Sequence, residues 1–83
     1  MKIPSEFCDY IESLMYEVNA RRDLCAFMIS HGMGESEAFE KYHQEYLRFN
    51  AQYMMAKNMV SQMYSEGKPW RIDFEKGELI FLD

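Results

Sequence analysis

The stretch "FEKYHQEYLRFNAQYMMAKNMVSQM", residues 39–63, decides how this chain folds. Apolar or aromatic residues recur in it at alternating spacings of three and four, which is typical of one buried face of an α-helix. These positions are Phe39, Tyr42, Tyr46, Phe49, Tyr53, Ala56, Val60 and Met63. Ser36 can cap the helix at its start, and Gly67, followed by Pro69, can end it. The pattern predicts a helix over about residues 37–66.

An earlier segment carries a matching stripe. Its positions are Phe7, Ile11, Leu14, Val18, Arg21, Cys25 and Met28. With Ser5 as the cap and Gly32 or Gly34 as the stop, a helix is predicted over about residues 6–31. If the chain turns back through residues 32–35, one antiparallel register places every member of one stripe opposite a member of the other. Ile11 then faces Ala56, and Val18 faces Phe49.

The stretch "WRIDFEKGELIFL", residues 70–82, alternates apolar and polar residues as a β-strand does. A two-residue Lys76-Gly77 loop, with Gly77 at positive φ, would pair Phe74 with Leu79 and Ile72 with Phe81. The predicted fold is therefore mainly α. It is a long antiparallel two-helix hairpin (about 6–31 and 37–66) followed by a C-terminal β-hairpin (about 70–75 and 78–82). Both belong to a single small domain, 1–83, with the helical hairpin at 5–66 and the β-hairpin tail at 69–83.

Composition limits the classes of function. The net charge of −5 argues against a surface that binds nucleic acid, because such a surface needs clustered Lys and Arg. No apolar run reaches the ~18 residues of a membrane span, and the N-terminus has no apolar signal core. Cys8 and Cys25 would lie about 25 Å apart on one helix, too far for a disulfide. We therefore expect a cytoplasmic protein with reduced thiols, and partners that are neither nucleic acid nor membrane.

More apolar residues remain than the helical seam can hide. Leu24, Phe27 and Ile29 lie off the first stripe, and a Met-rich group lies off the second. The β-hairpin, a second copy in a four-helix bundle, or a different protein could cover them. The segment Leu79–Leu82 is apolar on both faces and could pair with a strand of another chain. The residues predicted to contact a partner are Leu47, Met54, Met55, Met59, Trp70, Leu79, Ile80, Phe81 and Leu82.

Arg21 is the one charged member of the first stripe, and the predicted register places it opposite Tyr46. Glu17 lies one turn before it, and Glu45 precedes Tyr46. One reading is an arginine whose stem packs while its head reaches a carboxylate or water. The other is a structural polar layer of Arg21 and Tyr46 that sets the helix register.

The sequence shows no catalytic constellation. Neither cysteine has a predicted base beside it, and Gly-rich phosphate loops, Cys-x-x-Cys and His-Glu-x-x-His are absent. Glu40 and His43 have the Glu-x-x-His spacing of di-iron bundles, which would require a second copy and further acids such as Glu17. An exposed His or a surface salt bridge is the commoner explanation of that spacing. We predict no enzymatic activity, no catalytic residues, no cofactor and no resident metal.

A family resemblance is carried by "NARRDL" in the helical body and by Trp70, Ile72–Glu75 and Glu78 in the tail. The chain resembles small accessory proteins encoded beside Cys-x-x-x-repeat peptides and their radical-SAM modifying enzymes in clostridia-like bacteria. The resemblance implies a non-catalytic accessory in the production of a modified peptide. The leading prediction is a protein-interaction module that forms a homodimer or binds another protein. The alternatives are a small acidic inhibitor of a nucleic-acid-binding protein and, less favoured, a dimeric ferritin-like metal site.

Overall fold

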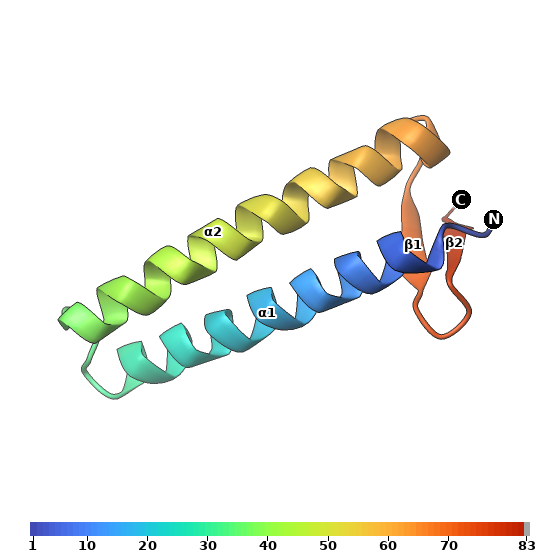
Figure 1. Cartoon of the computed structure of the whole chain (residues 1–83). Helices are drawn as coiled ribbons and strands as arrows, with labels where there is room; N and C mark the ends of the chain where they lie inside the picture. The colour runs from blue at the N-terminus through green and yellow to red at the C-terminus, as the bar shows by residue number, and fades with distance from the viewer. Residues whose placement is uncertain (83) are drawn as a thin grey trace.

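Two long helices lie antiparallel and a β-hairpin closes one end of the pair (Figure 1). The computed structural model describes residues 1–82 and measures 45 × 23 × 23 Å. The elements, in chain order, are α1 (Ser5–Ser30), α2 (Glu37–Val60), the π-helical turn η1 (Ser61–Ser65), β1 (Trp70–Asp73) and β2 (Glu78–Phe81). The fold class predicted from the sequence is confirmed, while Asp83 lies outside the described residues.

The turn between the helices has the predicted chemistry. Gly32 adopts φ +76°, and the amide of Met33 donates to the carbonyl of Met28, as in a Schellman motif. Ser36 then caps α2, because its Oγ accepts the amide of Phe39 at 3.1 Å. Both helix ends at this turn therefore have their orphan backbone groups bonded locally.

The predicted cap of α1 is wrong by one residue. Pro4 occupies the N-cap position without a side-chain hydrogen bond, and Ser5 is the first helical residue. The carbonyl of Pro4 accepts the amide of Cys8 at 3.0 Å. The φ of Pro4 is −54°, close to the value its ring imposes. A proline can therefore begin this helix where the sequence pattern favoured a hydroxyl cap.

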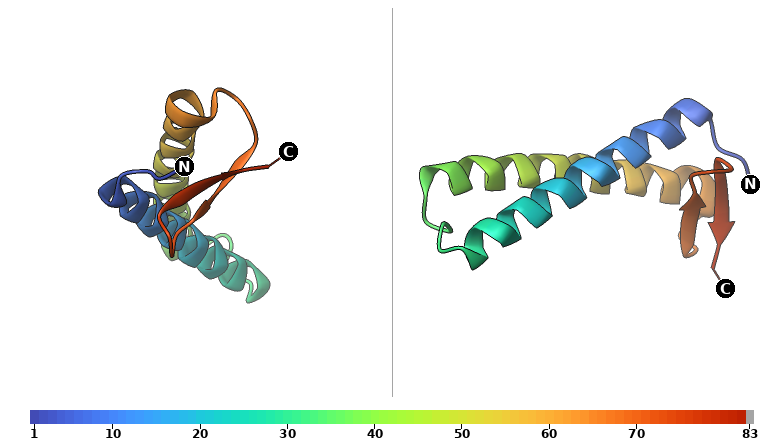
Figure 2. Two further views of the ribbon diagram at one scale, coloured as in Figure 1. Left: turned by 90° about the vertical axis from the view of Figure 1, so that its right-hand side faces the viewer. Right: turned by 90° about the horizontal axis from the view of Figure 1, so that it is seen from below.

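The two helices cross, which is clear when the molecule is seen from below (Figure 2). On α1 the buried residues are the predicted stripe members Ile11, Leu14, Val18, Cys25 and Met28, together with Cys8. On α2 only Ala56 and Val60 are fully buried, and the larger aromatic stripe residues are half-buried. The seam therefore closes most tightly where the small side chains of α2 let the backbones approach.

The last turn of α2 departs from the prediction. Met63, expected to continue the buried stripe, is 62% exposed. The π-helical turn η1 adds one residue to the helical repeat, so that Tyr64 and Ser65 take the inward positions instead. Glu66 at φ 52° and Gly67 at φ 86° then reverse the chain toward the strands. A pattern extrapolated at 3.6 residues per turn could not anticipate this change of phase.

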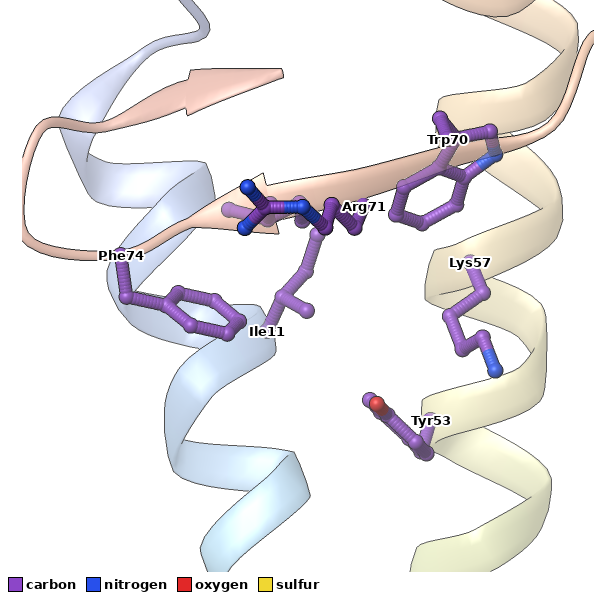
Figure 3. Close-up of a pocket in the computed structure, with 7 residues that line it drawn as sticks. Ile11, Tyr53, Lys57, Trp70, Arg71 and Phe74 are labelled. Carbon is purple, nitrogen blue, oxygen red and sulfur yellow. The ribbon is translucent and has the colours of Figure 1, made fainter. Parts of the chain in front are cut away.

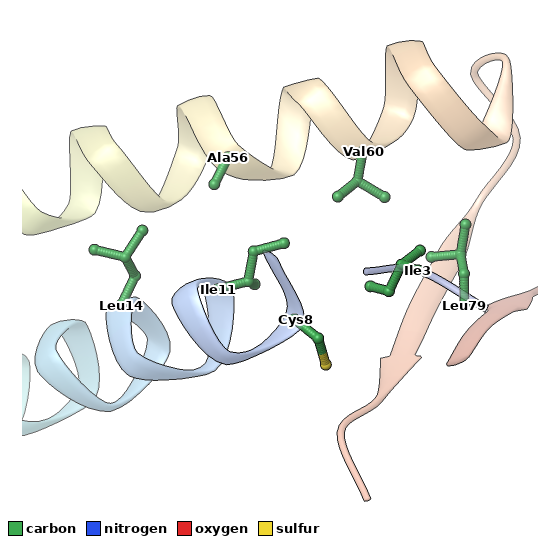
Figure 4. Packing of buried hydrophobic residues seen from close by; sticks show 7 residues of the cluster. All are labelled: Ile3, Cys8, Ile11, Leu14, Ala56, Val60 and Leu79. Atoms are coloured by element: carbon green, nitrogen blue, oxygen red, sulfur yellow. The ribbon is translucent and has the colours of Figure 1, made fainter. Parts of the chain in front are cut away.

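The core lies at the end of the helical pair that carries the strands (Figure 4). Side chains of the N-terminal segment, both helices and β2 converge there. The fully buried members are Ile3, Cys8, Ile11, Leu14, Ala56, Val60 and Leu79, and Trp70, Ile72 and Phe74 pack against them. The β-hairpin is thus part of the core rather than an appendage.

The β-hairpin has a different register from the predicted one. Ile72 pairs with Leu79 and Trp70 with Phe81, so the loop is the four residues 74–77 rather than Lys76-Gly77 alone. Asp73 Oδ1 accepts the amide of Lys76 at 3.2 Å, which stabilises the longer loop. Gly77 does adopt the predicted positive φ, at 64°. Because the shift is two residues, each side chain keeps its predicted face of the hairpin.

The N-terminal segment pairs with the outer edge of β2, which the sequence pattern did not predict. Lys2 forms a β-bridge with Glu78, and the amide of Leu79 donates to the carbonyl of Met1. The amide of Ile3 donates to the carbonyl of Gly77 at 3.2 Å. Leu79 therefore lies between two backbone partners, and this part of β2 is no exposed edge.

Replacing Leu79 with alanine should lower the free energy of unfolding by about 3 kcal/mol, since the side chain is only 2% exposed within the core. Urea denaturation followed by circular dichroism measures the change. Leu82→Ala is the matched control, because Leu82 is 45% exposed and should change stability by less than about 0.5 kcal/mol. Equal effects of the two substitutions would show that the hairpin does not pack on the helices.

Candidate interaction surface

The outer surface of α2 is apolar and exposed. Met54, Met55 and Met59 point away from the seam, and Met55 is 67% exposed. Leu47 lies two turns before Met54 on the same side of the helix. All four residues were predicted to contact a partner. The structure places them on the surface, where a partner can reach them.

The β-hairpin does not cover this surface. It packs at the end of the pair where α1 begins and α2 ends, over Ile3, Cys8 and Val60 (Figure 1). Leu24, Phe27 and Ile29 lie near the opposite end of α1 and remain exposed. The expectation that the hairpin could serve as the lid over the surplus apolar side chains is therefore wrong. No part of residues 1–82 covers them.

The strand residues predicted to contact a partner divide into two groups. Leu79 is buried in the chain's own core, so its predicted exposure to a partner is wrong in this fold. Trp70 is half-buried, and its indole Nε1 donates to Ser61 Oγ at 2.9 Å, which ties β1 to the end of α2. Ile80 is half-buried, whereas Phe81 and Leu82 are exposed. Only the last two remain fully accessible.

Tyrosines on the outer side of α1 are exposed as well and were missed in the sequence. Tyr16 is 62% exposed, and Tyr10 is exposed as well. Tyr16 shares a face with Leu24 and Phe27, at spacings of eight and eleven residues, opposite the buried stripe. This helical spacing was available in the sequence. An exposed tyrosine is a weaker signal of a partner contact than an exposed leucine, because its hydroxyl can hydrogen-bond to water.

Arg21 lies between the helices, as its place in the stripe predicted, and its head reaches a carboxylate, as the first of the two readings has it. The guanidinium lies 4.2 Å from the ring centroid of Phe49 and forms an ion pair with Glu17. Its Nε is buried without a hydrogen bond, and Glu45 Oε2 lies 3.6 Å away. Tyr46 instead stacks near His43, with ring centroids 6.3 Å apart. The contacts of Arg21 are therefore with Glu17, Glu45 and Phe49, and no contact with Tyr46 is found within residues 1–82.

The chemistry of Cys8 disfavours catalysis. Burial raises the pKa of the Cys8 thiol, and the negative charges of Asp9, Glu12 and Asp73 raise it further. A nucleophilic cysteine needs the opposite shift. Cys25 is also buried, and both thiols are free. Over residues 1–82 no group of three or more His, Cys, Asp or Glu side chains is arranged to hold a metal ion.

A cleft opens between β1 and the two helices (Figure 3). Its volume is about 260 Å³. The lining is Ile11 from α1, Tyr53 and Lys57 from α2, and Trp70, Arg71, Ile72 and Phe74 from β1 and the loop after it. Most of the wall is aromatic or aliphatic, and the two charged groups are both cations. Sequence patterns did not reveal this site, because its parts come from segments more than forty residues apart.

The chain matches no protein-family model, and no curated protein or solved structure is significantly similar to it. No helix within residues 1–82 combines the length and the apolar character needed to cross a membrane. The site must therefore be interpreted from its own geometry.

Replacing Arg21 with alanine should lower the free energy of unfolding by about 1 kcal/mol, because the stem packs between the helices and the guanidinium stacks on Phe49. Arg22→Ala is the matched control. Arg22 is exposed and only approaches Asp23, so the change should stay below about 0.5 kcal/mol. Thermal denaturation of both variants measures the two changes. An equal loss of stability in both variants would show that Arg21 has no special structural role.

Cys8 should react slowly with iodoacetamide at pH 8 in the folded chain, because its thiol is buried and its pKa is raised. In urea the same thiol should react at the rate of a free cysteine. A Cys25→Ser variant isolates Cys8 in the mass spectrum. Labelling of the native chain as fast as the unfolded one would mean that the β-hairpin does not cover this part of α1.

Proposed function

We propose that this protein is a non-catalytic interaction module that acts as a homodimer through the outer surface of α2. The observation that carries the proposal is the exposure of Leu47, Met54, Met55 and Met59 along one helix, on the part of the chain that the β-hairpin leaves uncovered. Extended apolar surface on a small chain is typical of a protein–protein contact.

A second copy of the same chain suits this surface. Two helical hairpins that pack through α2 form a four-helix bundle, in which each copy contributes the same residues to a two-fold interface. Methionine side chains are flexible and fill irregular gaps, so two copies of this surface can adjust to each other when they pack together. Small domains also gain stability by burying such a surface, since they bury a smaller fraction of their own chain.

We further propose that the dimer serves as an accessory in bacterial peptide modification. The support is the resemblance carried by Trp70, Ile72–Glu75 and Glu78 to proteins encoded beside radical-SAM enzymes and Cys-repeat peptides. Co-expression with such an enzyme and its peptide tests this step. Co-purification of the three proteins in a defined ratio supports it, and separate elution contradicts it.

Charge on the α2 surface should dissociate the dimer. The purified chain of 10.0 kDa should sediment as a species of about 20 kDa at micromolar concentration. The double variant Met55→Lys, Met59→Lys should sediment as a monomer, because two ammonium groups would be buried at the interface without partners.

Met33→Lys is the matched control, since Met33 is exposed in the turn at the far end of the helical pair. This variant should remain a dimer, and circular dichroism should show the same helix content for all three proteins. A wild-type chain that sediments as a monomer over the whole concentration range would contradict the proposal. So would a dimer that persists in the double variant.

A further inference from the structure

The cleft beneath β1 has an excess of positive charge in an acidic chain. Lys57 and Arg71 line it, and none of the seven lining residues is acidic. Among residues 1–82 neither cation has a carboxylate within ion-pair distance. The three ion pairs of this part of the chain are formed by Arg21 and Arg22. The ammonium of Lys57 instead lies 5.0 Å from the ring centroid of Tyr53. The net charge of the whole chain is −5, so a cleft lined by two cations and no carboxylate differs in charge from the chain as a whole.

The backbone of β1 offers hydrogen-bonding groups on its other edge. Leu79 directs its amide and carbonyl to Met1, away from β1, so the pair of Ile72 and Leu79 is not hydrogen-bonded across the two strands. Hydrogen-bonded pairs alternate with non-bonded pairs in an antiparallel ladder, so the bonded pairs are Arg71 with Ile80 and Asp73 with Glu78. The amide and carbonyl of Ile72 consequently point away from β2. They have no backbone partner within residues 1–82. Ile72 is also a lining residue of the cleft, so the strand that carries this edge forms part of the cleft wall.

The size of the cleft limits its occupant. Sites for whole small molecules are typically 300–1,000 Å³, and this one is about 260 Å³. It suits an anchoring side chain of a larger ligand. Trp70 and Phe74 lie on two sides with Ile11 between them, so an apolar anchor would be surrounded by carbon atoms (Figure 3).

We propose that the cleft binds an extended segment of a partner protein, in which an apolar residue alternates with an acidic one. The segment adds a strand to β1 through the free backbone groups of Ile72. Its apolar side chain enters the cleft between Trp70, Ile11 and Phe74. The neighbouring Glu or Asp carboxylate accepts hydrogen bonds from Lys57 and Arg71. This mode joins main-chain pairing, which supplies affinity, to a pocket and a charge pair, which supply specificity.

This proposal does not rest on the α2 dimer, although the two surfaces meet at Met54, which lines a neighbouring hollow with Lys57 and Trp70. Met55 and Met59 lie on another face of the helix from Lys57. Binding at the cleft and dimerisation can therefore be abolished independently.

Defined peptides test the proposal on the full chain. The probes are acetylated and amidated hexapeptides in which phenylalanine or valine alternates with glutamate, and a matched set with glutamine in place of glutamate. Trp70 is the only tryptophan and lines the cleft, so its fluorescence reports occupancy directly. Hydrogen exchange read by NMR at the amide of Ile72 reports the added strand.

The glutamate peptides should shift the fluorescence of Trp70 and slow exchange at Ile72. Glutamine peptides should bind about tenfold more weakly, equivalent to about 1.4 kcal/mol. Lys57→Gln and Arg71→Gln should each weaken the glutamate peptides to a similar degree, while Lys41→Gln, an exposed change earlier on α2, should leave binding unchanged. Each variant should stay folded and melt within a few degrees of the parent, because neither cation forms an ion pair in residues 1–82 and Lys57 loses only its contact with the Tyr53 ring.

Four results would overturn the inference. These are no fluorescence response to any peptide, equal binding of the glutamate and glutamine sets, binding by the Lys57 and Arg71 variants as tight as by the parent, and unchanged exchange at Ile72. A further probe is a peptide whose only carboxylate is a free C-terminus. Tighter binding of this probe than of the glutamate set would mean that the cleft recognises the C-terminus of a partner and not an acidic side chain. The Met55→Lys, Met59→Lys variant should bind the peptides as the parent does, so failure of the dimer leaves this test intact.

Discussion

The burial of Leu79 between Ile3 and the two helices is the contact on which the rest of this fold depends. A two-stranded hairpin is barely stable in water, and two crossing helices have an open end. Leu79 joins them, since its backbone pairs with Met1 and its side chain lies in the cluster with Ile11 and Val60. Trp70 adds a side-chain hydrogen bond to Ser61 at the same end. The strands, the N-terminal segment and the helix ends therefore stabilise one another as a unit.

The position of this core determines which surfaces stay free. Small residues of α2 at Ala56 and Val60 are fully buried near the strands, whereas the bulky aromatic residues toward the turn are only half-buried. Nothing in residues 1–82 covers the outer face of α2, and the cleft under β1 opens where the strand meets the diverging helices. An interaction surface and a cleft thus arise from the same arrangement. The raised pKa of Cys8 disfavours a nucleophilic role for that thiol.

Periodicity predicted the helical hairpin because both of its halves repeat the same three-and-four spacing over at least three heptads. Gly32 and Ser36 also have local roles that need no tertiary partner. It also identified the exposed group of Leu47, Met54, Met55 and Met59 as residues left over from the seam. The errors have local causes. A π-helical turn moved Met63 to the surface, and the side chain of Asp73 closed a longer hairpin loop than Gly77 alone would. Leu79 was assigned to a partner because its pairing with Met1 is a contact across nearly the whole chain.

By itself the sequence determined the element types, their order, the antiparallel pairing of the helices and the face on which each strand residue lies. These follow from periods of 3.6 and 2 and from turn residues, which act over a few positions. Only the tertiary structure decided where the hairpin docks, which edge of β2 the N-terminal segment covers, and that Lys57 and Arg71 share one cleft. These features depend on contacts between segments far apart in the chain, whose geometry no local period specifies.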